Sequence, residues 1–227
     1  MDEAQNRGYG SEYHLCRYLT QAPTRLSDAV VKSIRQTGEL IWIPPEGSKE
    51  WKGMRFLQRG QTVNESVVEK WTKFWPQRGN PPNWDAIARL DAGTRSEWLL
   101  FEAKANHAEF CSSPCGAIGP SREIIQKALG RTKAYLGVHR DFLWLGTYYQ
   151  YANRIACLHF PNSIAEVPAR LIFIYFTGDC FPDKRRCPET ESEWHGLIEA
   201  CHLTLGLPER HRLSDRIHEV FLPVLGT

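Results

Sequence analysis

Three ionisable side chains stand inside two apolar segments that each have the length of a β-strand. Asp85 lies in "PPNWDAIARL", and Glu102 and Lys104 lie in "EWLLFEAKAN". Burying carboxylates and an ammonium group is costly unless they pair or meet a cation. Hard divalent cations prefer carboxylate and carbonyl oxygens. We therefore expect Asp85, Glu102 and the backbone carbonyl of Ala103 to bind Mg²⁺ or Mn²⁺, with Lys104 assisting a metal-bound water in phosphodiester hydrolysis.

The period of a β-strand predicts how these groups are placed. Successive side chains face opposite sides of a sheet, so Glu102 and Lys104 point to the same side. The turn-forming sequence "DAGTR" between the two segments predicts a hairpin that closes near Gly93. Such a hairpin puts the start of its first strand, with Asp85, beside the end of its second. A surface ion pair between Glu102 and Lys104 is the alternative interpretation.

The rest of the chain predicts helices and strands around this hairpin. Helical spacing of apolar residues is found in segments 10–20, 26–38, 63–75, 122–138, 145–160 and 191–206, and strand patterns in segments 39–45, 169–179 and 217–224. Gly38 is expected to stop the second helix. The order indicates an α/β fold with a mixed central β-sheet flanked by helices on both faces. We expect one domain over 1–227, with a motif core over about 81–179 and a C-terminal elaboration over 180–227.

The two charged segments resemble the signature of the restriction-endonuclease-like PD-(D/E)xK nuclease superfamily. Asp85 matches the acidic residue of the first motif strand, and residues 102–104 match (D/E)xK. The residue before the aspartate is Trp84 rather than proline, although two prolines stand close by. The motif covers roughly residues 81–106, and the order of elements over 10–179 is compatible with the core of this superfamily.

This resemblance implies a metal-dependent nuclease that acts on DNA with Mg²⁺ or Mn²⁺ as its cofactor. Members of the superfamily commonly add an acidic residue from a preceding helix; Glu12 is the preferred match, with Glu69 and Glu65 as alternatives. A polar residue from the following helix often approaches the scissile phosphate. Gln126 is the candidate for that role, and Lys133 stands further along. For each residue the alternative is a solvated helix face.

Charge and cysteine content leave two other function classes open. The 28 Lys and Arg residues exceed the 26 Asp and Glu by too little to indicate nucleic-acid binding from net charge alone. One alternative is a catalytically inactive nucleic-acid-binding module on the same fold. The other is a zinc-stabilised interaction protein, in which zinc is held by residues from the set His107, Cys111, Cys115, Cys180 and Cys187.

Further features bear on location and partners. The chain starts without an apolar leader segment and has no apolar run of bilayer-spanning length, so we expect a cytoplasmic protein that does not bind membranes. The odd count of seven cysteines favours reduced thiols. A homodimer or a protein partner is possible. The basic triplet 184–186 can contact nucleic acid or lie solvated, and the tyrosines at 148, 149 and 151 can stack on bases or pack in the core.

Overall fold

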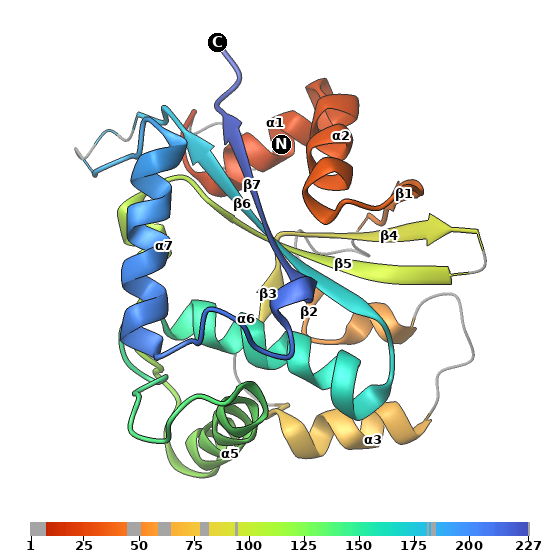
Figure 1. The fold of residues 1–227 in the computed structure, drawn as a ribbon, viewed down its shortest axis with the longest axis vertical. Coiled ribbons are helices and arrows are strands. Elements are labelled where there is room, and N and C mark those ends of the chain that lie inside the picture. The colour runs from red at the N-terminus through yellow and green to blue at the C-terminus, as the bar shows by residue number, and fades with distance from the viewer. Residues whose placement is uncertain are drawn as a thin grey trace.

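A five-stranded sheet runs through the centre of the molecule (Figure 1). The structure, a computed structural model, describes residues 8–44, 51–58, 65–77, 82–93, 95–180, 182 and 185–226. The strands lie in the order β1-β4-β5-β6-β7. Their bounds are Glu39–Trp42 for β1, Ala86–Ala92 for β4, Arg95–Lys104 for β5, Ala169–Thr177 for β6 and Ile217–Pro223 for β7.

The sheet is mixed, because the hairpin strands pair in one sense and the later strands in the other. β4 pairs antiparallel with β1 and β5, whereas β6 pairs parallel with β5 and β7. The predicted hairpin is confirmed: Ala92 pairs with Arg95, and Gly93 adopts the positive φ of 70° that the turn needs. A short second sheet joins β2, Trp51–Lys52, to β3, Asn83–Trp84.

Two helices cover one face of the sheet. α1 spans Ser11–Gln21 and α2 spans Pro23–Ile34, and both lie above the sheet in Figure 1. Pro23 suits the first turn of α2, where its missing N–H breaks no helical hydrogen bond. The core on this face includes Leu15, Tyr18, Leu26, Val30, Ala88, Leu99, Phe101, Ile172 and Ile174.

Four longer helices cover the opposite face. They are α3 at Glu65–Phe74, α5 at Gly119–Leu136, α6 at Tyr149–His159 and α7 at Glu191–Leu205. The short helix α4, His107–Cys111, follows β5 directly, and a π-helical segment, Phe160–Ala165, follows α6. The core here is rich in aromatic side chains, among them Trp71, Trp75, Trp84, Trp144, Phe160, Phe173 and Trp194. Helices on both faces of a mixed sheet confirm the predicted α/β class.

The end of α2 differs from the prediction. The helix stops at Arg35, which adopts a left-handed conformation with φ 51°, and not at Gly38. A Cβ on Gly38 would lie 2.8 Å from the backbone oxygen of Asp91. Glycine is therefore needed at position 38 for the close approach of the chain to β4.

The C-terminal segment contributes to the sheet. Residues 180–227, expected as an elaboration, supply α7 and the edge strand β7, which pairs with β6 from Leu171↔Ile217 to Thr177↔Pro223. Trp194 of α7 donates its indole N–H to the backbone oxygen of Phe176, so this helix is tied to the end of β6. In the part of the chain that is described, no helix is long and apolar enough to cross a membrane.

Candidate functional site

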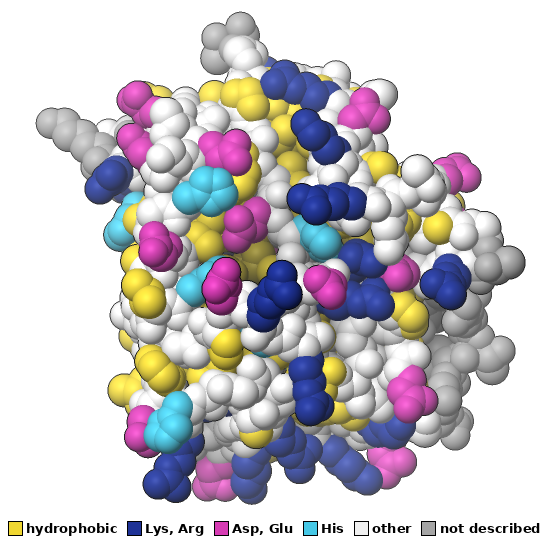
Figure 2. Space-filling model, viewed as in Figure 1, with side chains coloured by type: hydrophobic (Ala, Val, Ile, Leu, Met, Phe, Trp, Pro, Cys, Tyr) yellow, Lys and Arg dark blue, Asp and Glu magenta, His cyan; other side chains and the backbone are white. Residues whose placement is uncertain are grey.

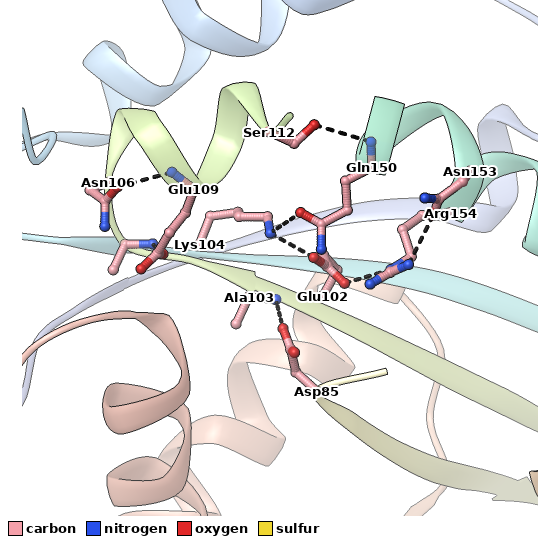
Figure 3. A network of polar contacts seen from close by, with 11 residues as sticks. Asp85, Glu102, Ala103, Lys104, Asn106, Glu109, Ser112, Gln150, Asn153 and Arg154 are labelled. Carbon is pink, nitrogen blue, oxygen red and sulfur yellow. Dashed lines mark hydrogen bonds and ion pairs between the residues drawn. The ribbon is translucent and has the colours of Figure 1, made fainter. Parts of the chain in front are cut away.

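Asp85 lies at the start of the hairpin, beside the edge of β5. The chain bends at this residue between β3 and β4, and its backbone N–H still donates to Phe101 at 3.1 Å. Its carboxylate Oδ2 accepts a 2.7 Å hydrogen bond from the N–H of Ala103 (Figure 3). Asp85 is thus held by the residue between Glu102 and Lys104.

Glu102 and Lys104 share the α6 face of the sheet, as strand alternation predicts. Both are buried, with 1% and 7% of their surface exposed. Glu102 Oε1 and Lys104 Nζ are 2.6 Å apart. Within the described residues no hydrogen bond or ion pair joins either side chain directly to the carboxylate of Asp85, which lies at the strand edge (Figure 3).

Arg154, which the sequence analysis did not single out, completes the ion pairing of Glu102. It projects from α6 and donates through Nε to Glu102 Oε2 at 2.6 Å. Its Nη1 donates to Asn153 Oδ1 at 2.8 Å, and its guanidinium lies 5.2 Å from the ring centroid of Trp84. An arginine within the largely apolar "YANRIACLHF" was the available signal, since burying a charge requires a partner.

Gln150 stands one helical turn before Arg154 and reaches Lys104. The amide Oε1 of Gln150 accepts a 2.8 Å hydrogen bond from Lys104 Nζ, while its backbone N–H donates to Ser112 Oγ at 3.2 Å. A spacing of four residues puts Gln150 and Arg154 on one face of α6. This face therefore holds both charged ends of the Glu102–Lys104 pair (Figure 3).

The end of β5 is fixed immediately after Lys104. Asn106 Oδ1 caps α4 by accepting from the N–H of Glu109 at 3.0 Å, and Glu109 Oε2 accepts from the N–H of Ala105 at 2.9 Å. Two buried polar atoms nearby, Asn106 Nδ2 and Tyr175 Oη, have no hydrogen-bond partner among the residues that the structure describes. Tyr175 is the register partner of Lys104 on β6.

The pKa values of Asp85 and Glu102 are shifted in opposite directions. Burial, and then the charge of Glu102, raises the pKa of Asp85 to about 7. Burial also acts to raise the pKa of Glu102, but the charges of Arg154 and Lys104 outweigh it and hold that pKa below its usual value. Near neutral pH, therefore, Glu102 is ionised while Asp85 is close to its titration midpoint.

The donor chemistry fits a hard divalent cation in part. The carboxylates of Asp85 and Glu102 are suitable ligands, and no cation of the described chain lies within ion-pair distance of Asp85. Both oxygens of Glu102, however, already accept from Lys104 and Arg154. Ala103 contributes its N–H to the network through the contact with Asp85. The residues described contain no group of three or more His, Cys, Asp or Glu side chains arranged for a metal ion.

The structure does not bring the predicted helix residues into this network. Glu12 is exposed on α1, which covers the opposite face of the sheet, and Gln126 is exposed on α5. Among described contacts neither reaches the three motif residues. Gln150 of α6 makes the contact with Lys104 instead.

The alternative helix residues also have other surroundings. Glu69 is exposed and forms an ion pair with Lys73 at 2.6 Å. Lys133 donates to the backbone oxygens of Arg140 and Phe142, and so closes the turn after α5. The side chain of Glu65 lies outside the described part of the structure.

The structure also gives the surroundings of the residues considered for zinc and nucleic-acid binding. His107 and Cys111 approach to 3.6 Å on α4, Cys115 is buried, Cys180 is exposed and Cys187 is half-buried. All seven cysteines are free thiols. Of the basic triplet, position 184 lies outside the described residues, while the backbone oxygen of Arg186 accepts from the N–H of His107 at 3.0 Å. The three tyrosines at 148, 149 and 151 pack in or against the core.

Comparisons with protein-family models, with curated proteins and with solved structures return no match. The resemblance to the PD-(D/E)xK superfamily therefore stays a prediction. It depends on Asp85, residues 102–104 and the mixed sheet that carries them.

Proposed function

We propose that the protein is a metal-dependent nuclease that hydrolyses phosphodiester bonds in DNA, on a restriction-endonuclease-like core. The observation that carries the proposal is the position of Asp85. Its carboxylate is held by the N–H of Ala103, so it lies against the residue that links Glu102 to Lys104. Two carboxylates of different pKa and a buried ammonium group at the end of one hairpin suit acid–base and electrostatic catalysis.

Each residue has a role that its contacts support. Mg²⁺ or Mn²⁺ held by Asp85 and Glu102 would supply a Lewis acid and an activated water. Lys104 is oriented by Gln150 and Glu102, and its ammonium group can donate to the attacking water or to a phosphate oxygen. Arg154 holds the second oxygen of Glu102, so a metal bound by that carboxylate would have to share its oxygens with Arg154 and Lys104.

The pairing of Glu102 favours a second candidate function. Because Lys104 and Arg154 already neutralise this buried carboxylate, the same arrangement is stable without a metal. A catalytically inactive nucleic-acid-binding module on this fold would keep such a closed network. The two candidates differ in one property, which is the binding of a divalent cation.

Cleavage assays test the first candidate. Labelled linear and circular DNA are incubated with Mg²⁺ or Mn²⁺ and with wild type, Asp85→Ala or Lys104→Ala. We expect cation-dependent cleavage that falls by about 100-fold or more in both variants. Arg89→Ala is the matched control, because Arg89 is a half-buried residue of the same hairpin that pairs with Asp91.

The outcomes separate the two candidates. Equal residual cutting by wild type and both variants contradicts the nuclease and points to a contaminant. DNA binding without cleavage, together with no heat of Mg²⁺ binding in calorimetry, supports the inactive module. Cleavage of the circular substrate identifies endonuclease action.

A further inference from the structure

An arginine-rich cavity opens at the end of the sheet where β6 and β7 begin. Its volume is about 600 Å³, and it lies between the end of α2 and the 3₁₀ turn Ser214–Arg216 that precedes β7. Figure 2 shows Lys and Arg side chains gathered near the centre of this face, over the start of β7. The lining residues used below, which we call the arginine pocket, are Arg35, Arg170, Arg212, Asp215, Arg216 and His218.

Arg170 forms the fixed base of the arginine pocket. It is 6% exposed, and its Nε donates to Glu97 Oε2 at 2.6 Å. Its Nη1 donates to the backbone oxygen of Asp215 at 2.8 Å and lies 3.0 Å from His218 Nε2. Glu97 Oε2 also accepts from Arg216 Nη1 at 3.0 Å. The carboxylate of Glu97 therefore accepts hydrogen bonds from the guanidinium groups of both Arg170 and Arg216.

Two further arginines of the arginine pocket do not pair with Glu97. Arg35 and Arg212 are exposed, and in the described part of the chain no carboxylate pairs with either. The guanidinium of Arg212 lies 5.1 Å from the ring centroid of Tyr135, a cation–π contact. The four arginines of the arginine pocket stand against two carboxylates, that of Glu97, which pairs with Arg170 and Arg216, and that of Asp215 in the lining, so the formal charge count leaves an excess of two positive charges.

Histidine does not add to this charge at neutral pH. Burial, and then the charge of Arg170, lowers the pKa of His218 to about 4, so its ring is neutral. The excess of positive charge therefore comes from arginines, whose ionisation does not change between pH 5 and 9.

We propose that the arginine pocket binds the terminal phosphate of a nucleotide or of a nucleic-acid strand. A phosphate monoester carries close to two negative charges at pH 7, which matches the excess of positive charge. Planar guanidinium groups donate pairs of hydrogen bonds to phosphate oxygens, and the cavity has the volume of a small-molecule site. The inference does not depend on the nuclease proposal, because the arginine pocket lies at the start of β6 whereas Lys104 ends β5.

Calorimetry on the full chain tests this site, in EDTA so that no cleavage occurs. The probes are inorganic phosphate, adenosine 5′-monophosphate, and one oligonucleotide with and without a 5′-phosphate. We expect binding of at least one phosphorylated probe, weakened by about tenfold or more in the double variant Arg35→Ala/Arg212→Ala. Arg140→Ala is the control, since the side chain of Arg140 is 90% exposed outside the arginine pocket.

The pattern of probe binding identifies the ligand. Tight binding of the mononucleotide identifies a free nucleotide as the ligand, whereas binding of the 5′-phosphorylated oligonucleotide alone identifies a strand end. Failure of every probe to bind at millimolar concentration overturns the inference. So does equal affinity of the double variant and wild type, or equal affinity for the oligonucleotides with and without phosphate when neither inorganic phosphate nor the mononucleotide binds. Lys104→Ala should keep this binding even where it abolishes cleavage, so the two proposals can fail separately.

Discussion

Glu102 is a buried carboxylate shared by two cations, and this arrangement makes each partner costly to remove. Lys104 and Arg154 contact different oxygens of the same group at 2.6 Å. Removing one partner of a buried ion pair leaves part of the remaining charge without compensation. Truncating Arg154 should therefore cost much more stability than truncating an ordinary surface arginine.

We expect Arg154→Ala to lower the free energy of unfolding by about 3–5 kcal/mol. Arg89→Ala, which breaks the more exposed pair with Asp91, should cost about 0–1 kcal/mol. Urea denaturation monitored by circular dichroism measures both. Adding Glu102→Gln to Arg154→Ala should cost further stability, because it leaves the buried ammonium group of Lys104 without its carboxylate partner. A cost for Arg154→Ala no greater than for Arg89→Ala would show that Glu102 is not held as described.

Asp85 makes stability depend on pH. In the folded chain its pKa is about 7, and an unfolded aspartate titrates near about 4. Between these values the unfolded chain loses its proton first, so the free energy of unfolding falls as pH rises. Asp85→Asn keeps an oxygen for the N–H of Ala103 and removes this dependence.

We expect Asp85→Asn to gain about 1–3 kcal/mol of stability relative to wild type between pH 4.5 and pH 8. Thermal unfolding across this range measures the difference. If the stability difference between Asp85→Asn and wild type does not change with pH, the carboxyl of Asp85 keeps its ordinary pKa in the folded chain.

At the scale of elements, α6 rather than α5 supplies the polar residues above β5. Gln150 binds Lys104, whereas Gln126 is exposed. If the nuclease proposal holds, Gln150→Ala should reduce cleavage about tenfold or more, because Lys104 loses the group that orients it. Gln126→Ala should leave the rate unchanged. The reverse result would restore the original prediction for Gln126.

The helices α5 and α7 end in the same way but in different surroundings. Gly137 and Gly206 are left-handed C-caps with φ 77° and 64°. A Cβ on Gly137 meets nothing within 4 Å, whereas one on Gly206 would lie 2.3 Å from the ring of Phe142. Alanine should cost about 1 kcal/mol at position 137 from backbone strain alone. At position 206 the displaced ring should add about 1–3 kcal/mol, measurable by denaturation. Equal costs would show that the ring moves freely.

Local patterns predicted the hairpin and the helix within residues 145–160, but not that this helix faces the hairpin. Strand alternation and the turn at Gly93 placed Glu102 and Lys104 on one side of the sheet, because these contacts are close in sequence. Arg154 lies 52 residues after Glu102, and no local spacing shows which helix will pack above β5. The same reason explains why β7 was expected outside the core, since its pairing with β6 is a long-range contact.

At the scale of the whole molecule, one sheet separates two cores. Trp71, Trp75, Trp84, Trp144 and Trp194 all lie in the core under α3, α5, α6 and α7, whereas Trp42, which is partly buried, packs against the core under α1 and α2. The two cores are built from alternate side chains of the same strands, so neither can be lost without disturbing the other.

We therefore expect a single unfolding transition in guanidinium chloride. Tryptophan fluorescence, which reports mainly on one core, should give the same midpoint as far-ultraviolet circular dichroism, which reports on all elements. Two separate midpoints would show that the two layers unfold as independent units, and would contradict the prediction of one domain.

The order of the strands leaves β1 and β7 at the margins of the sheet, where backbone groups can pair with a neighbouring molecule. β1 has four residues, and β7 carries His218 and Glu219 and ends at Pro223, which has no N–H to offer. Short length, polar side chains and a terminal proline all discourage the addition of a foreign strand. We therefore expect both edge strands of the five-stranded sheet to resist the intermolecular pairing from which fibrils grow.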